Sequence, residues 1–443
     1  MLRSESHTVP LVIVEGFLSS AGAIVWGNFE RHSNFACQSN GEHDRQTIFA
    51  SVGPVSSLHD RACELFYCLK GGTVDYGQKH SEENSHARFG RKYEQGLYPE
   101  WSADRPLHFF GHSMGGPTII KLQWLLATGF FGKEHSPDMI LSVNTVSSPF
   151  RGTQLVYSLG EDSRNAPAVR PFSPGDILAK GVHVAAYLAP VLPRIFDLHA
   201  DARGLSFREA SLGSFVRQLA KSEWAESRDA TPYDATFEAA DEREAMREGA
   251  VYPNTYYRSY CASLTDPNAQ TSSASWLSKL LIWPMHAASA VIANFDFSTL
   301  RPIPAFMETV AAARRASKMG TGSADAANVE DGVIDVATGG DYLSASLCAN
   351  DGVVPLFSQW HPLECRSTQC KHYSHSDNIL EGSETRRYSH SPEAGVWNVH
   401  HLSNTHHFSV VPFWLGTQSQ KAFWLDLGHW LRAIDTARRE RSK

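Results

Sequence analysis

The sequence predicts an α/β fold with a mostly parallel central sheet that helices cover on both faces. Short apolar runs, typical of buried strands, alternate along the chain with segments whose apolar residues recur at helical spacing. This alternation favours parallel pairing, because each helix carries the chain back across one face of the sheet. The 443 residues are 42% hydrophobic and 20% charged, which suits one large globular core.

The first third of the chain follows this pattern in order. We expect strands at 11–14, 47–52, 107–110 and 139–146, and helices at 57–69 and from the turn after 110 to about 128. In the helix at 57–69, apolar side chains share one face, and Gly71-Gly72 ends it. Residues 73–100 are polar and contain histidines, which indicates a loop excursion.

Two further helices interrupt the alternation in the middle of the chain. Ser173 lies before Pro174 and three residues before Asp176, which is the pattern of a helix N-terminus. Ser206 and Glu209 form a second capping pattern, and an amphipathic stripe follows it to about residue 219. These two helices are additional to the sheet.

The remaining chain returns to the first pattern. A strand is expected at 255–263 and another at 396–402, and a long helix with a basic tail ends the sequence. Residues 265–340, rich in Ala, Ser and Pro, are interpreted as an irregular insertion.

Charge and composition exclude several classes of protein. The formal net charge is −7 without a basic block, which makes nucleic-acid binding unfavourable. No run of about 18 apolar residues indicates a membrane span. Seven cysteines are too few for a disulfide scaffold of this length. Residues 1–10 lack the apolar core of a signal peptide, so we expect either a cytosolic protein or a leader already removed.

One motif carries nucleophile chemistry. Gly111-His112-Ser113-Met114-Gly115 is a G-x-S-x-G sequence between an apolar strand and a helix. Small residues flank the serine of such a turn because larger ones clash, and the turn raises the Ser113 hydroxyl above the sheet. The backbone N–H of Met114 is a candidate oxyanion donor. The alternative interpretation is a glycine-rich turn without catalytic chemistry.

A serine nucleophile needs a base and an acid, which follow it along the chain in this class of turn. Asp351, in an Asn-Asp-Gly turn, is the best acid, although such turns also occur without a catalytic role. The residues alone leave the base open among His400, His401, His406 and His407. Phe17, in the turn after the first strand, is the candidate for the second oxyanion donor.

Several motifs together resemble the zinc-containing bacterial lipases, the thermoalkalophilic Bacillus-type enzymes and their staphylococcal relatives. The matching stretches, besides the serine turn, are Asp60-Arg61-Ala62-Cys63-Glu64, Gly71-Gly72-Thr73-Val74-Asp75-Tyr76-Gly77, His86-Ala87-Arg88-Phe89-Gly90, Ser148-Pro149-Phe150-Arg151-Gly152-Thr153, Pro253-Asn254-Thr255-Tyr256-Tyr257, Asn350-Asp351-Gly352 and Gly395-Val396-Trp397-Asn398. They span most of the chain and are weakest between about 265 and 340.

The resemblance implies an α/β-hydrolase fold in one domain over 1–443, with a helical lid for which 172–222 is the candidate. It also implies a triad of Ser113, Asp351 and His401, in which His401 matches the family's histidine between Val and Leu. Where the family has His-Gly before the oxyanion Phe, this chain has Glu15 and Gly16, and Met114 stands where Gln is typical.

The resemblance further implies a structural Zn²⁺ held by Asp60, His80, His86 and Asp234, with 60–90 and 223–240 as the zinc-binding insertion. Two carboxylates and two imidazoles suit Zn²⁺, and four protein ligands close its tetrahedral shell. Many relatives also bind calcium through acids near the catalytic histidine. Because residues 402–405 contain no carboxylate, the sequence gives calcium no support.

We therefore expect a serine carboxylic-ester hydrolase, a triacylglycerol lipase that works at an oil–water interface and, by resemblance, is secreted. The alternatives are a carboxylesterase for short soluble esters, an inactive lipid-binding homologue, and a metallohydrolase that uses the Asp/His set. Oligomeric state stays open. Cys365 and Cys370, with His372 and His375 nearby, suit either a second metal cluster or a disulfide loop, and the spacing matches no strong zinc pattern.

Overall fold

The computed structural model describes residues 8–19, 22–193, 197–264, 276–311, 333–334, 345–373, 379–381 and 392–441. Much of the predicted irregular insertion at 265–340, and His375, lie outside these ranges. The described part of that insertion contains a long helix, α12 (Trp276–Ala293), so it is not irregular throughout.

The strands form one central sheet in the order β2-β1-β5-β6-β7-β10-β9-β8. Among the described residues, neighbouring strands of this sheet pair in parallel, except that the edge strand β8 runs antiparallel to β9. The strands are β1 (Leu11–Val14), β2 (Thr47–Ala50), β5 (Leu107–His112), β6 (Ile140–Val146), β7 (Tyr256–Ser263), β8 (Val333–Ile334), β9 (Cys370–Tyr373) and β10 (Trp397–Ser403). The predicted mostly parallel sheet is confirmed.

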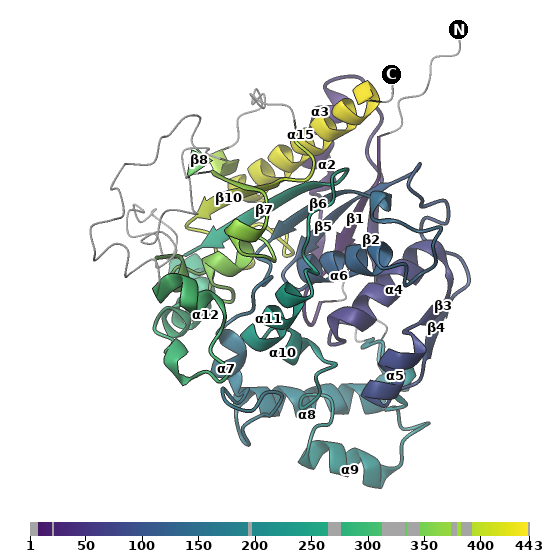
Figure 1. Cartoon of the computed structure of the whole chain (residues 1–443), viewed down its shortest axis with the longest axis vertical. Helices are drawn as coiled ribbons and strands as arrows, with labels where there is room; N and C mark the ends of the chain where they lie inside the picture. Colours follow the sequence, from purple (N-terminus) through teal and green to yellow (C-terminus); the bar gives the residue numbers. More distant parts are fainter. Residues whose placement is uncertain are drawn as a thin grey trace.

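Helices cover both faces of this sheet (Figure 1). On one face lie α4 (Leu58–Lys70) and α6 (Gly115–Ala127), and on the other α15 (Gln418–Arg441) packs with α2 (Glu30–Ser33) and α3 (Phe35–Gln38). Strand β1 shows why both faces are apolar. Val12 and Val14 join the core under α4 and α6, whereas Leu11 and Ile13 join the core under α15. Each such buried aliphatic side chain contributes about 1.5–3 kcal/mol of transfer free energy.

The segment at 73–100 is more ordered than the sequence suggested. It contains β3 (Gly72–Asp75), α5 (Gln78–Asn84) and β4 (Phe89–Tyr93), and the two strands pair as an antiparallel ribbon beside the main sheet. Most of the ribbon's residues are exposed or half-buried. It therefore lacks the apolar alternation by which strands are recognised in a sequence.

The two additional helices are α8 (Pro174–Leu188) and α9 (Leu212–Ala220), which pack on each other away from the main sheet (Figure 1). The Ser173 hydroxyl accepts a hydrogen bond from the Asp176 N–H, so the first predicted cap is confirmed. The second prediction is displaced, because Ser206 closes a separate turn on Glu209 and Ser211 caps the helix.

Short helices complete the described fold. They are α1 (Ala23–Trp26), α7 (Leu155–Leu159), α10 (Thr231–Asp234) and α11 (Phe237–Ala245). Within the residues described, none of the helices has both the length and the apolar character needed to cross a lipid bilayer.

Candidate active site and metal centre

Ser113 stands on a sharp turn between strand β5 and helix α6. Its backbone has φ 53°, a left-handed conformation that is costly for a residue with a side chain. Two backbone hydrogen bonds hold the turn. The Ser113 N–H donates to the Val146 carbonyl at 3.1 Å, and the Ser113 carbonyl accepts from the Gly116 N–H at 3.1 Å. This strained turn is the elbow that the G-x-S-x-G motif predicted.

The two motif glycines are required by space. A Cβ at Gly111 would lie 2.5 Å from the Gly116 nitrogen. A Cβ at Gly115 would lie 2.0 Å from the Val14 carbonyl oxygen. Both distances are far below van der Waals contact, so only glycine lets helix α6 approach strands β5 and β1 this closely.

Asp351 and His407 form a buried pair beyond the ends of the strands. The Asp351 Oδ2 lies 2.9 Å from the His407 Nδ1, and the Asp351 Oδ1 accepts hydrogen bonds from the Val353 and Val354 N–H groups at 2.9 and 2.8 Å. The His407 N–H also donates to the Asp351 carbonyl at 3.0 Å. The carboxylate therefore fixes the orientation of the imidazole and holds a proton on Nδ1, which leaves Nε2 available as a base.

This histidine lies beside the serine turn. The His407 ring centroid is 4.9 Å from that of His112, the residue immediately before Ser113. The His112 Nε2–H donates to the His407 carbonyl at 3.0 Å. Burial lowers the pKa of His112 to about 3, so His112 is a neutral structural contact between the two segments.

The structure places His407 against Asp351, whereas His401, the histidine predicted as the base, lies elsewhere. His401 is inside β10, level with Cys261 of β7, and its ring centroid lies 6.5 Å from that of His372. The acid turn lies past the strand ends, where the Leu264 N–H donates to the Asn350 carbonyl at 2.8 Å. Functional groups of parallel sheets gather in the loops at these carboxyl ends, and His407 is in such a loop.

The turn that carries Phe17 lies directly against the nucleophile. A Cβ at Gly16 would lie 2.7 Å from the Ser113 Cβ and 3.3 Å from its Oγ. The buried Arg61 holds this turn, because its guanidinium donates to the carbonyls of Glu15 and Gly53 and to the Thr118 hydroxyl. Phe17 and Met114 both line the cavity at Ser113. Phe17 comes before the serine in the sequence and Met114 directly after it.

Glu15 has a structural role at the position where the related lipases have histidine. Its Oε1 accepts hydrogen bonds from the Trp26 Nε1–H at 2.8 Å and from the Ser19 hydroxyl at 2.9 Å. The Glu15 side chain therefore connects the Phe17 turn to the aromatic core beneath α15. The path of the backbone after β1 is kept.

We expect Gly16→Ala to reduce kcat by about 10²-fold, comparable to the loss of one oxyanion donor. The added methyl group must displace either the Phe17 turn or Ser113, while substrate binding in the apolar cavity is kept. Steady-state kinetics on a soluble ester measures this. Gly213→Ala in α9 is the control, because only the Ser211 hydroxyl lies near its new methyl group, at 3.9 Å. Unchanged kcat in Gly16→Ala would contradict the assignment of this turn.

An apolar cavity of about 130 Å³ opens at Ser113. Apart from the serine, its walls are mainly aliphatic and aromatic, and helix α8 contributes Gly175 and Leu178 to them. The other apolar walls are Phe17, Met114, Pro149, Leu155, Val156, Leu159, Val169, Trp224, Ala225, Pro232, Ala235, Val353 and Val354. Such a lining favours a hydrocarbon group beside the nucleophile.

One acid lies in this lining. Glu161 is buried, and its Oε1 accepts a hydrogen bond from the Ala168 N–H at 3.1 Å. Burial raises the pKa of Glu161 to about 7, because the charged form loses its hydration. The carboxyl group is therefore mainly protonated below pH 7, and the cavity then carries no charge from it.

A second group of side chains, here called the Asp/His cluster, joins helix α4, helix α5 and the segment after α9. It consists of Asp60, His80, His86 and Asp229, and one ligand atom from each lies within 4.8 Å of all the others. The His80 Nε2 lies 3.1 Å from Asp60 Oδ1 and 3.2 Å from Asp229 Oδ1, and the His86 Nε2 lies 3.4 Å from Asp229 Oδ2. Zinc with N and O ligands at their usual distances has tetrahedral edges of about 3.3 Å, close to these values.

The donor atoms of the Asp/His cluster fit a metal ion. Within the described residues, the His86 Nε2 and the Asp229 Oδ1 are buried without a hydrogen-bond partner. The His86 Nδ1 donates to the Ala87 carbonyl at 2.8 Å, which turns the unprotonated Nε2 toward the cluster. Arg203 bonds both carboxylates from one side, the Asp60 Oδ2 at 3.0 Å among them.

The fourth member of the Asp/His cluster is Asp229, whereas the predicted ligand, Asp234, lies outside it. Asp234 accepts a hydrogen bond from the Leu58 N–H at 2.7 Å, and its other oxygen lies 3.5 Å from Arg243. It therefore caps the first turn of α4 rather than joining Asp60, and burial raises its pKa to about 6. Asp229, five residues earlier and before α10, lies 3.2 Å from the His80 Nε2 and 3.4 Å from the His86 Nε2.

A strained serine elbow, a buried Asp–His pair at the strand ends and a mostly parallel sheet define an α/β-hydrolase fold. Residues 7–301 match the family model described as "Lipase-like, C-terminal domain". The chain belongs to this family.

Relatives of known function support the same family. The chain is 31% identical to a lipase of Staphylococcus hyicus over 279 residues, which are 58% of this chain and 40% of that protein. It is 30% identical to Lipase 1 of Staphylococcus aureus over 281 residues, 58% of this chain and 38% of that protein. The matched region thus spans less than half the length of these relatives.

Solved structures extend the similarity to nearly the whole chain. The Staphylococcus hyicus lipase superposes with a TM-score of 0.62 at 23% identity, covering 98% of this chain and 97% of that chain. Lipase 1 of Pelosinus fermentans gives a TM-score of 0.59 at 25% identity, with coverage of 96% and 98%. EstA of Clostridium botulinum gives 0.58 at 25% identity, with coverage of 98% and 89%.

Proposed function

We propose that this chain is a serine carboxylic-ester hydrolase and acts as a triacylglycerol lipase. The observation that carries the proposal is the buried Asp351–His407 pair, held beside the elbow of Ser113 at the edge of an apolar cavity. The family assignment and the staphylococcal relatives favour the same chemistry.

The reaction follows from the order of these groups. His407 Nε2 takes the proton of the Ser113 hydroxyl as its oxygen attacks the ester carbonyl carbon. Asp351 orients His407 and stabilises the imidazolium that forms. The N–H groups of Phe17 and Met114 stabilise the oxyanion. The protonated His407 then donates to the departing alcohol. A water molecule, activated by the same histidine, releases the fatty acid from Ser113.

Helices α8 and α9 are proposed to form a lid over the cavity. Leu178 of α8 lines the cavity, so this helix shields the acyl site from water. The outer surface of the lid exposes apolar side chains, including Phe172 (89% exposed), Ile177 and Leu212 (66% each) and Val216 (56%). Exposed apolar residues on paired amphipathic helices favour adsorption to a lipid surface. We propose that adsorption opens the lid.

The Asp/His cluster is proposed to hold a structural Zn²⁺ ion. The four side chains would complete its shell, so the metal would stabilise the fold without taking part in the reaction. They join three segments that are far apart in sequence, around Asp60, His80 and Asp229. Secretion is proposed on the sequence resemblance alone.

The limited size of the described cavity favours one alternative, a carboxylesterase for short soluble esters. If α8 and α9 move away at a lipid surface, the site that binds the acyl chain becomes longer. If these helices stay in place, the site stays short. We therefore expect turnover of emulsified long-chain triacylglycerols to exceed that of dissolved short-chain esters by about 10-fold or more, since each buried CH₂ contributes about 0.8 kcal/mol.

The experiment compares purified wild-type enzyme with Ser113→Ala on esters of increasing chain length, below and above their solubility limit. A fluorophosphonate probe with site mapping identifies the nucleophile. Labelling of Ser113 with a preference for short soluble esters would make the chain an esterase. Absence of labelling would indicate an inactive homologue, and turnover retained in Ser113→Ala would indicate metal-dependent hydrolysis.

A further inference from the structure

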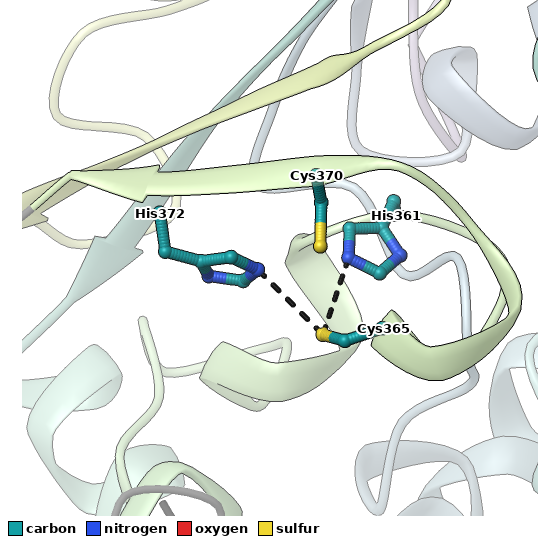
Figure 2. A group of neighbouring side chains, drawn as sticks. All are labelled: His361, Cys365, Cys370 and His372. Carbon is teal, nitrogen blue, oxygen red and sulfur yellow. Dashed lines mark hydrogen bonds between the residues drawn. The ribbon is translucent and has the colours of Figure 1, made fainter. Parts of the chain in front are cut away.

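A second group of metal-ligating side chains lies apart from the Asp/His cluster, beside strand β9, the neighbour of edge strand β8. It consists of His361, Cys365, Cys370 and His372, and is here called the Cys/His cluster (Figure 2). One ligand atom from each residue lies within 4.8 Å of all the others. All four come from a stretch of twelve residues, between the end of η6 (Leu356–Gln359) and the third residue of β9.

We propose that the Cys/His cluster binds one Zn²⁺ ion as a closed structural site. Two cysteine sulfurs and two imidazole nitrogens in tetrahedral arrangement are a donor set that selects zinc. This site is independent of the proposed hydrolase activity, which uses none of the four residues.

The distances suit a tetrahedral shell. The Cys365 Sγ lies 3.5 Å from the His361 Nε2 and 3.6 Å from the His372 Nε2 (Figure 2). Zinc at its usual distances, about 2.3 Å to sulfur and 2.0–2.1 Å to nitrogen, gives a tetrahedral S···N edge of about 3.6 Å. Both separations therefore agree with the edge that a shared zinc ion would give.

The proton positions also favour a metal over hydrogen bonds within the cluster. The His361 Nδ1 donates to the Leu363 carbonyl at 2.7 Å, so in the neutral ring its Nε2 carries a lone pair toward Cys365. The Cys365 thiol has one proton and can donate it to only one of the two imidazoles. A cation that binds both nitrogens and the sulfur satisfies them together.

The surroundings support the same conclusion. His361 and His372 are each 1% exposed, so their rings are taken out of water. The His372 Nδ1 is buried without a hydrogen-bond partner among the described residues. The polar contact that the structure gives this ring is the one between its Nε2 and the Cys365 Sγ. Burial of an imidazole with so little hydrogen bonding is costly unless another interaction compensates it.

Local geometry explains how such a short stretch converges. Cys370 and His372 are two apart on β9 and therefore point to the same face, whereas Lys371 between them is exposed. The chain before β9 turns through η7 (Cys365–Ser367), which brings Cys365 and His361 back over that face (Figure 2). The four side chains of this loop thus converge on one point, as the ligands of a metal ion do.

Binding is balanced in charge and protons. Zn²⁺ displaces the proton of each thiol, and the resulting two thiolates and two neutral imidazoles leave the complex uncharged. The ion would fasten β9, which pairs with β10 only through Cys370–Tyr373, to the segment that follows the Asp351 turn. Gln359 already fixes the start of that segment to β7 through two hydrogen bonds with Ala262, at 2.8 and 3.0 Å.

The test uses Co²⁺ as a spectroscopic probe in the whole 443-residue chain. The chain is stripped of metal under reducing conditions and loaded with Co²⁺. The Cys/His cluster is expected to give a thiolate-to-cobalt charge-transfer band and intense visible bands of tetrahedral Co²⁺. The Asp/His cluster has no sulfur and gives no charge-transfer band. Zn²⁺ is expected to abolish the band by displacement.

Variants assign the band to these residues. Cys365→Ser with Cys370→Ser is expected to remove the band and one zinc ion per chain, measured by elemental analysis of the purified zinc form. Cys348→Ser is the matched control, because Cys348 is exposed and outside the cluster, and it is expected to keep both. Asp229→Asn is expected to keep the band, which separates the two metal sites.

The wild-type protein alone keeps the proposal testable if the double variant does not fold. Alkylation of the denatured chain in chelator without reductant is expected to modify Cys365 and Cys370. Protection of both cysteines, reversed by reductant, would show a disulfide and overturn the proposal. Free thiols with no charge-transfer band, or a band that persists in the double variant, would overturn it as well.

Discussion

His407→Ala is expected to lower kcat by about 10³–10⁴-fold, whereas His401→Ala keeps kcat within about 3-fold of wild type. The reason is the partner of Asp351, whose carboxylate lies 2.9 Å from the His407 ring. Without that imidazole, Ser113 has no base, and the remaining rate comes from oxyanion stabilisation and binding alone. Initial rates on a soluble ester measure both variants.

His401→Ala is the matched control, since the same side chain is removed six residues earlier. Its ring is near His372, so its expected effect is on the contact between β10 and β9 rather than on catalysis. Fluorophosphonate labelling supplies a second measurement, because Ser113 should react slowly in His407→Ala and normally in His401→Ala. The opposite pattern would restore His401 as the base and refute the pairing.

Asp229→Asn is expected to lose one zinc ion per chain and to lower the melting temperature by about 4 °C, whereas Asp234→Asn keeps the metal. A metal ion present at a free concentration of about 1,000 times its dissociation constant adds about 4 kcal/mol to the free energy of unfolding. In a chain of this size, losing that contribution lowers the melting temperature by several degrees. Asp229 lies within 3.4 Å of both histidines of the Asp/His cluster, but Asp234 binds the backbone of α4.

These two substitutions are chemically identical and five residues apart, so the comparison separates metal binding from general loss of a buried acid. Asn at 234 can still accept the hydrogen bond from the Leu58 N–H, and the raised pKa of Asp234 makes its acid form a close match to the amide. Calorimetry and elemental analysis are the measurements. Metal lost from Asp234→Asn and kept in Asp229→Asn would show that the sequence-based ligand was right.

Several features of the fold were predictable because they depend on neighbouring residues. Strands β1, β5, β6 and β7 are buried at every position, and β10 is buried at four of its seven positions. The serine elbow requires glycines within two residues of Ser113, which the motif displays. The ribbon of β3 and β4 was missed, since its exposed strands carry no apolar alternation.

The residues of the candidate sites also divide into those that a local sequence pattern predicts and those that it does not. Ser113 and Asp351 lie in turns with local signatures. His407 and Asp229 do not, although His407 was one of four histidines that the chain order allowed. The neighbouring histidine at 401 matches the pattern of related lipases better, but it lies within β10, before the strand ends. Asp229 and Asp234 both follow α9, and no local pattern distinguishes them.

The sequence by itself determined the parallel α/β core and the turn that carries Ser113, because short-range spacing and burial specify these. Tertiary structure alone decided which histidine contacts Asp351, which aspartate contacts His80, and that four residues beside β9 converge. The physical reason is that hydrogen bonds and metal coordination act over a few ångströms. The separations that matter therefore depend on where each loop leaves its strand, and distant segments of the chain set those positions.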